Sequence, residues 1–107
     1  MEVRPRQLRR YQDENSDHPF DAWITGLKDR KGRGIILDRL DRLEDGNMGD
    51  CDPVGEGVFE FRIHFGPGYR VYFGEDGDLV ILLCGGIKDT QRRDILTAKL
   101  FWRDYNA

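Results

Sequence analysis

The chain has 107 residues, 38% of them hydrophobic, and a formal net charge of −3 at pH 7. This length predicts a single domain over residues 1–107, and the acidic balance argues against a protein that coats nucleic acid through bulk electrostatics. The sequence has no apolar run long enough to span a membrane and no signal-peptide pattern, so we expect a cytoplasmic protein without a membrane partner.

The first half of the chain predicts one strand followed by two helices. Arg6 to Asp13 mixes apolar and charged residues and reads as a strand at a sheet edge. Pro19 suits the first position of a helix whose apolar positions are Phe20, Trp23, Ile24 and Leu27. A second helix is expected from about Gly34 to Glu44, with its apolar stripe at Ile36, Leu40 and Leu43. Together they predict a helical hairpin that covers one face of a sheet.

A β-hairpin is expected after a Gly, Asp and Pro-rich loop at Asp45 to Gly57. Its alternation places one set of residues on a core face, across a three-residue Gly-Pro-Gly turn: Phe59, Phe61, Ile63 and Phe65 against Tyr69, Val71 and Phe73. The same register places His64 opposite Arg70 and Arg62 opposite Tyr72 on the other face, beside Glu60. That polar face is either merely solvated or an anion-binding surface able to handle a phosphodiester.

The turn signal Asp76-Gly77 predicts a third strand at Leu79 to Cys84, connected as a hairpin and buried on both faces. Asp89 or Thr90 is suited to cap a last helix with Ile95, Ala98 and Trp102 on one face. The resulting order is strand, two helices, three-strand meander and helix, which is typical of an α+β domain.

Six short motifs are spread over nearly the whole chain. They are Pro19-Phe20-x-x-Trp23, Arg39-Leu40-Asp41-Arg42-Leu43, Gly46-Asn47-x-Gly49-Asp50, Val54-Gly55-Glu56-Gly57-Val58, Gly66-Pro67-Gly68-Tyr69-Arg70-Val71-Tyr72-Phe73 and Leu82-Leu83-Cys84-Gly85-Gly86. In this order they resemble the RelE/ParE toxin superfamily, and more closely its HigB-like addiction module killer branch. The resemblance implies a RelE-like α+β fold: an antiparallel sheet with an N-terminal strand, a helical hairpin, a three-strand meander and a C-terminal helix.

The resemblance also implies a function and a set of partners. The chain is expected to be the toxin of a type II toxin–antitoxin system, and the best-known members of the superfamily cleave messenger RNA in the ribosomal A site. Expected partners are the ribosome, mRNA and a cognate antitoxin, for which a HigA-like helix-turn-helix protein is the candidate. DNA contact is expected only through the complex with the antitoxin.

Two arginines match positions where the superfamily keeps active-site arginines. Metal-free RNA cleavage uses the 2′-hydroxyl of the substrate as nucleophile, so the protein must stabilise a pentavalent phosphorane. Arg62 is our first candidate for this role and Arg70 the second. The alternative is that both arginines pair with Glu60 or with a carboxylate of the antitoxin, since cross-strand ion pairs are ordinary. No cofactor or metal is expected, because Cys51, Cys84 and the two histidines form no ligand pattern.

Proton transfer requires a further side chain. His64 suits it, because imidazole exchanges protons near neutral pH, although a surface histidine is the plainer interpretation. Glu60 is a second candidate base or a partner that holds Arg62. Contacts with substrate are expected from residues that bind phosphate or stack on a base: Lys88, Tyr72, Arg92 and Arg93. Lys88 is equally suited to capping carbonyl groups, and Arg92 and Arg93 to a solvated helix face.

The polar face therefore supports two classes of function. The first is a ribosome-dependent, metal-independent mRNA endoribonuclease. The second is a non-catalytic protein, either a ParE-like inhibitor of DNA gyrase or a degenerate module that only binds an antitoxin. The density of side chains able to handle RNA on one sheet face favours the endoribonuclease.

Overall fold

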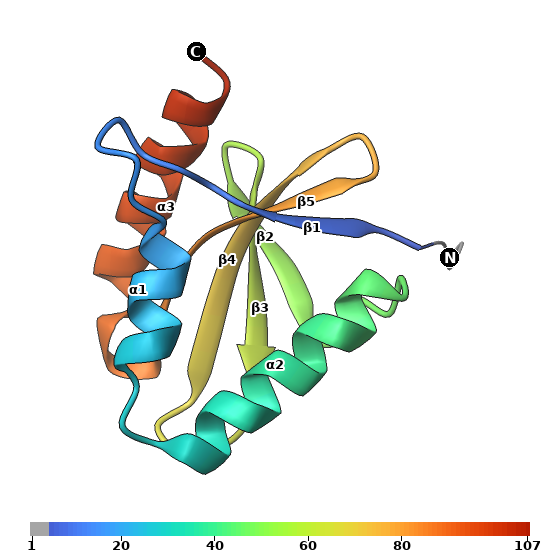
Figure 1. Ribbon diagram of the computed structural model, residues 1–107, viewed down its shortest axis with the longest axis vertical. Helices are drawn as coiled ribbons and strands as arrows, with labels where there is room; N and C mark the ends of the chain where they lie inside the picture. The colour runs from blue at the N-terminus through green and yellow to red at the C-terminus, as the bar shows by residue number, and fades with distance from the viewer. Residues whose placement is uncertain (1–4) are drawn as a thin grey trace.

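A computed structural model describes residues 5–107 of the protein, so residues 1–4 of the expected domain lie outside the described part. The elements in chain order are β1 (Gln7–Arg10), α1 (Pro19–Gly26), α2 (Arg30–Glu44), β2 (Cys51–Gly55), β3 (Val58–Ile63), β4 (Tyr69–Asp76), β5 (Leu79–Ile87), the 3₁₀ turn η1 (Lys88–Thr90) and α3 (Gln91–Tyr105) (Figure 1). Within residues 5–107 no helix is long and apolar enough to cross a membrane.

The described strands form one sheet in the order β1-β5-β4-β3-β2. Neighbours from β2 to β5 pair antiparallel, as the meander predicts, whereas β1 pairs parallel with β5. The α+β class is confirmed, and so is the edge position of the first strand. The expectation of an antiparallel sheet is wrong at β1, which pairs parallel with β5. A parallel pair needs a long crossover connection, and the segment from α1 to β4 provides it.

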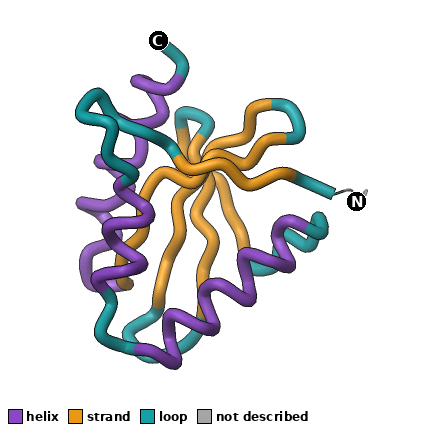
Figure 2. Tube along the Cα trace, viewed as in Figure 1, coloured by secondary structure: helices purple, strands orange, loops and turns teal. Residues whose placement is uncertain are grey.

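Helices cover both faces of the sheet (Figure 2). Helices α1 and α2 pack on one face over a core of Phe20, Ile24, Ile36, Leu40, Leu43, Phe61, Ile63, Tyr69, Val71, Phe73, Val80 and Leu82. The core under α3 contains Tyr11, Val58, Tyr72, Ile81, Leu83, Cys84 and Ala98. Strand β5 contributes Val80 and Leu82 to the first core and Ile81, Leu83 and Cys84 to the second, so its expected burial on both faces is confirmed.

Helix α2 begins at Arg30, earlier than the Gly34 that the sequence predicts. The side chain of Asp29 caps it by accepting a hydrogen bond from the Gly32 amide at 2.9 Å. The backbone of α2 lies so close to Tyr69 at Gly32 that a Cβ atom there would stand 2.7 Å from the Tyr69 ring. A glycine is therefore required at this position because of the close packing, not because of chain flexibility. Gly32 and Gly34 therefore both lie inside α2.

Strand β2 lies inside the segment that was expected to be a loop. Cys51 pairs with Phe61 and Asp52 with Glu60, before the register shifts between Pro53 and Gly55. The strand is at the sheet edge and largely exposed, so it lacks the alternation of apolar and polar residues that marks a half-buried strand. The pairing of β2 with β3 brings Asp50 and Asp52 beside β3.

Candidate functional site

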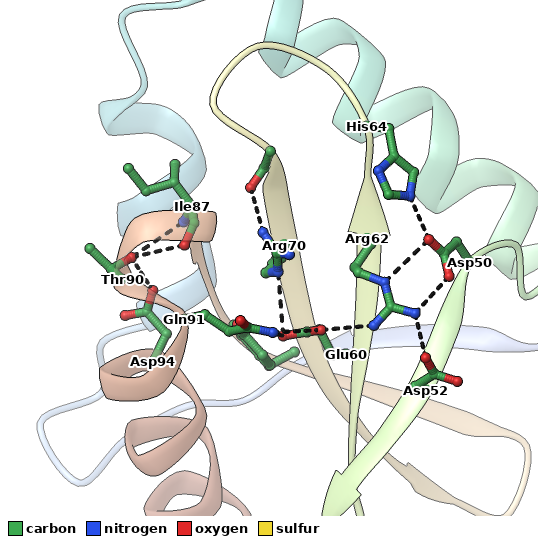
Figure 3. Close-up of polar contacts among 12 residues, drawn as sticks. Asp50, Asp52, Glu60, Arg62, His64, Arg70, Ile87, Thr90, Gln91 and Asp94 are labelled. Carbon is green, nitrogen blue, oxygen red and sulfur yellow. Dashed lines mark hydrogen bonds and ion pairs between the residues drawn. The ribbon is translucent and has the colours of Figure 1, made fainter.

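Polar residues on the α3 side of β3 and β4 form a continuous network (Figure 3). Arg62 lies directly opposite Arg70, and Glu60 directly opposite Tyr72. The expected pairs, His64 with Arg70 and Arg62 with Tyr72, are wrong by two positions because residues 64–68 all lie in the turn. A shift of two residues leaves each side chain on its expected face.

Glu60 is the buried centre of this network, with 1% of its surface exposed. Its carboxylate accepts hydrogen bonds from the Tyr72 hydroxyl at 3.0 Å, from Nη1 of Arg62 at 3.0 Å and from Nε2 of Gln91 at 2.8 and 3.1 Å. Nε of Arg70 lies 3.5 Å away. A carboxylate is buried at low cost only when it is paired and hydrogen-bonded, and these donors meet that requirement. Glu60 therefore holds the arginines in place.

Arg62 is surrounded by carboxylates. Its Nη2 lies 2.7 Å from Oδ1 of Asp50 and also contacts Asp52, while Nη1 donates to Glu60. Hydrogen bonds to Asp50 and then Asp52 raise the pKa of the guanidinium above its ordinary value. Three carboxylates, one of them the expected Glu60, therefore compensate the charge of Arg62.

His64 is the exposed end of the network. The side chain is 73% exposed, and Nε2 lies 2.5 Å from Oδ2 of Asp50. Asp50 is thus shared between His64 and Arg62, and these hydrogen bonds, that of Arg62 first, lower the pKa of its carboxyl to about 2. A carboxylate of this kind fixes the orientation of an imidazole and leaves the second ring nitrogen facing solvent, which is the arrangement that a general base requires.

Arg70 and Tyr72 are buried beneath α3, although the sequence predicts a surface for both. Nη1 of Arg70 donates to the Gly68 carbonyl at 3.1 Å, but its buried Nε has no aligned hydrogen-bond acceptor and only the ion pair with Glu60. Burial first, and Glu60 second, raise the pKa of the Tyr72 hydroxyl above its usual range. Tyr72 is fully buried, so a base cannot stack on it in this conformation.

The unpaired positive charges lie beside the network rather than within it. Lys88 and Arg92 are exposed and make no ion pair with a carboxylate in the described residues, whereas Nε of Arg93 lies 3.5 Å from Asp94. Lys88 borders the β3–β4 turn, since its Cβ lies 3.3 Å from the position of a Cβ atom built at Gly68. Lys88 therefore lies at the end of the sheet that carries His64, whereas Arg92 and Arg93 lie at the start of α3.

Three residues of the network are absent from the candidates that the sequence supplies: Asp50, Asp52 and Gln91. Asp50 belongs to one of the six motifs, but only the pairing of β2 with β3 brings it to Arg62. Gln91 carries no signal in the sequence, because its role depends on how α3 docks. Within residues 5–107 no group of His, Cys, Asp and Glu is arranged to hold a metal ion, and Asp50 and Asp52 converge on Arg62 instead.

Comparison with known protein families identifies the family of this chain. The model of the phage-derived Gp49-like family (DUF891) matches residues 22–99, which include the whole network. The chain belongs to the Gp49-like family. This toxin-like family is related to addiction module killer proteins, so the Gp49-like chain has a toxin–antitoxin context, and an antitoxin is the partner that the family suggests.

A relative from Haemophilus influenzae (strain ATCC 51907 / DSM 11121 / KW20 / Rd) is similar to this Gp49-like chain. The two are 51% identical over 82 residues, which is 76% of this chain and 83% of the relative, an uncharacterized protein. No solved structure matches the chain. The Gp49-like assignment therefore rests on sequence, and the RelE-like form of the fold remains a prediction.

Proposed function

We propose that this Gp49-like chain is the toxin of a type II toxin–antitoxin system and acts as a ribosome-dependent, metal-independent mRNA endoribonuclease. The observation that supports it is the contact between His64 and Asp50 at the exposed end of a buried, charge-compensated network. The partners in this proposal are the ribosome, mRNA and a HigA-like antitoxin, with DNA contacted only through the antitoxin complex. Residues 1–107 act as one cytoplasmic RelE-like domain.

The proposed reaction uses the 2′-hydroxyl of the RNA. His64 removes the hydroxyl proton as the 2′-oxygen bonds to the adjacent phosphorus, and the bond from phosphorus to the 5′-oxygen breaks. The products are a 2′,3′-cyclic phosphate and a 5′-hydroxyl, whose oxygen takes a proton from a second donor, for which the ammonium group of Lys88 is our candidate. Arg62 faces the charge that develops on the phosphorane, and Arg92 and Arg93 extend the cationic rim.

Glu60, Arg70 and Tyr72 have positioning roles in this proposal. The burial of Glu60 and its hydrogen bonds from Tyr72 and Gln91 make it a fixed acceptor that orients Arg62. Arg70 supports the same carboxylate from the opposite strand. Proton transfer is assigned to His64 because it alone among our four catalytic candidates has an exposed side chain.

The proposal is tested by mapping where a defined message is cut on programmed ribosomes. We expect codon-phased cuts that leave a 2′,3′-cyclic phosphate and a 5′-hydroxyl, formed only when the message occupies the ribosome. Intact messages, or cuts that leave a 3′-hydroxyl and a 5′-phosphate as in metal-dependent hydrolysis, contradict the proposal.

A second function is favoured by one observation. Three carboxylates face Arg62, and Arg70 is largely buried, so this part of the network presents little positive charge to a phosphate. A non-catalytic ParE-like inhibitor of DNA gyrase, or a degenerate antitoxin-binding module, needs no such charge. Growth arrest with intact messages and gyrase-dependent DNA breaks supports the inhibitor, and the absence of any growth effect supports the degenerate module.

A further inference from the structure

The outer surface of α3 carries an apolar pair that nothing in the described structure covers. The side of α3 that packs on the sheet contributes Ala98, with Ile95 and Trp102 beside it. On the opposite side, Leu96 is 62% exposed and Leu100 59% exposed. They are four residues apart on a helix, so their side chains are neighbours and form one ridge.

Arginines flank this ridge. Arg92 precedes Leu96 by one helical turn, and Arg93 lies on its other side. An open hollow of about 470 Å³ at this end of α3 is lined by Asp89, Thr90, Arg92, Arg93 and Leu96. Arg92 pairs with no carboxylate in the described residues, although the chain as a whole is acidic. We call Arg92, Arg93, Leu96 and Leu100 the α3 outer face.

We infer that the α3 outer face binds an acidic amphipathic helix of a partner protein, and that this partner is the antitoxin. Two leucines one turn apart fit the groove between the side-chain rows of another helix, and exposed arginines beside them complement carboxylates on that helix. The identity of the partner rests on the function proposed above, whereas the surface and its chemistry rest on α3 alone.

A second copy of this chain fits the face poorly. If two α3 helices packed antiparallel with Leu96 of one copy against Leu100 of the other, Arg93 would lie opposite Arg103, and Arg92 opposite Asp104. Each attractive contact would then be offset by a like-charge contact. A heterologous acidic helix complements both Arg92 and Arg93.

The position of the face suggests how the partner inhibits the toxin. Gln91, which holds Glu60, is the residue directly before Arg92. A helix on the outer face therefore covers one of the unpaired cations that border the network and lies against the turn of α3 that anchors Glu60. Occupation of the face excludes the substrate from this side of the site.

The test uses the purified protein encoded by the reading frame next to the gene of this chain. Its Kd is measured by calorimetry for the wild type, for the double variant Leu96→Glu/Leu100→Glu and for Leu37→Glu. Leu37 is the matched control, since it is 45% exposed but lies on α2 beside a different cleft. Glutamate is a good helix former, and a glutamate at position 96 pairs with Arg92 at helical spacing, so α3 remains folded.

We expect the double variant to weaken binding at least about a hundredfold and Leu37→Glu to leave it unchanged. The double variant should still arrest growth but no longer be rescued by the neighbouring protein. An unchanged Kd, no binding to the wild type, or weakening only by Leu37→Glu overturns the inference. A wild-type dimer that the double variant converts to a monomer also overturns it, because a second copy then occupies the face.

The docking inference and the endoribonuclease proposal fail separately in this design. Binding through the α3 outer face by a chain that cleaves no message supports the docking inference and removes the endoribonuclease. If the chain cleaves the message but its partner binds the α3 variants with the wild-type Kd, only the docking inference is overturned.

Discussion

Nε2 of Gln91, the first residue of α3, lies 2.8 and 3.1 Å from the two carboxylate oxygens of Glu60 on β3. This contact joins the helix to the sheet at the point where Arg62 and Arg70 meet the same carboxylate. The geometry of the candidate site therefore depends on the docking of α3.

Glu60→Gln is expected to lower the free energy of unfolding by about 3 kcal/mol, because removal of one partner leaves the buried Arg70 charge uncompensated. Urea denaturation measures this loss. The control is Asp52→Asn, which removes an exposed partner of Arg62 and is expected to cost less than about 1 kcal/mol. Equal losses in the two variants would show that Glu60 has no special role.

His64→Asn is expected to reduce the single-turnover cleavage rate about a hundredfold or more, since the proposed base is lost. The thermal midpoint should not change, because the side chain is largely exposed. His18→Asn is the matched control: it changes the other histidine of the chain, at the N-cap of α1, where asparagine is favourable. Cleavage at the wild-type rate by His64→Asn would show that another residue is the general base.

Arg62→Ala is expected to slow cleavage about a hundredfold, or about 3 kcal/mol, through the loss of a charge that faces the transition state. Circular dichroism should show a folded protein, because no core cavity opens. Phe61→Ala, on the opposite face and 2% exposed, should instead cost about 3 to 5 kcal/mol of stability. A folded Arg62→Ala protein with wild-type cleavage would favour the gyrase inhibitor.

Stability is expected to decrease in acid because the pKa of Asp50 is about 2 in the folded chain and 3.8 without its partners. A carboxyl with a lowered folded pKa stabilises the fold above its unfolded pKa, and that contribution is lost as the pH falls through the folded pKa. The loss from Asp50 therefore falls between about pH 4 and pH 2. Asp29 and Glu56, whose pKa values are also lowered, act in the same direction. Urea midpoints across this range should fall less steeply for Asp50→Asn, and identical slopes contradict the assignment.

Two glycine substitutions should have opposite effects on stability. A Cβ atom at Gly85 would stand 2.2 Å from Cε3 of Trp23, so Gly85→Ala is expected to cost about 1 to 3 kcal/mol through overpacking. Gly34 lies within α2 with no atom within 4 Å of such a Cβ, so Gly34→Ala should stabilise the chain by about 0.5 to 1 kcal/mol. Thermal unfolding of both variants checks the signs, and a stabilised Gly85→Ala would refute the packing of Trp23.

The sequence predicts the parts of the fold that depend on local patterns. Both early helices, the meander and the last helix carry apolar spacing that is read directly from the chain. The register between β3 and β4 was missed because alternation fixes which face a residue occupies, not how many residues the turn contains. Strand β2 was missed because an exposed edge strand with Pro53 and Gly55 has the composition of a loop.

The candidate site was only partly predictable for a similar reason. Alternation correctly places Glu60, Arg62 and Tyr72 on one polar face, but it contains no information about what covers that face. The packing of α3 buries Glu60 and Tyr72, and the pairing of β2 brings Asp50 to Arg62 and His64. Both are long-range contacts, which a local pattern does not encode.

The parallel pairing of β1 with β5 has a consequence for the synthesis of this protein. Gln7 emerges from the ribosome early, but its register partner Leu79 follows only after both early helices and three further strands have been made. This edge of the sheet therefore cannot close until most of the polypeptide has been made. Until then β1 lacks its β5 partner, and the charged Arg9 and Arg10 help to keep the unpaired strand from pairing with other chains.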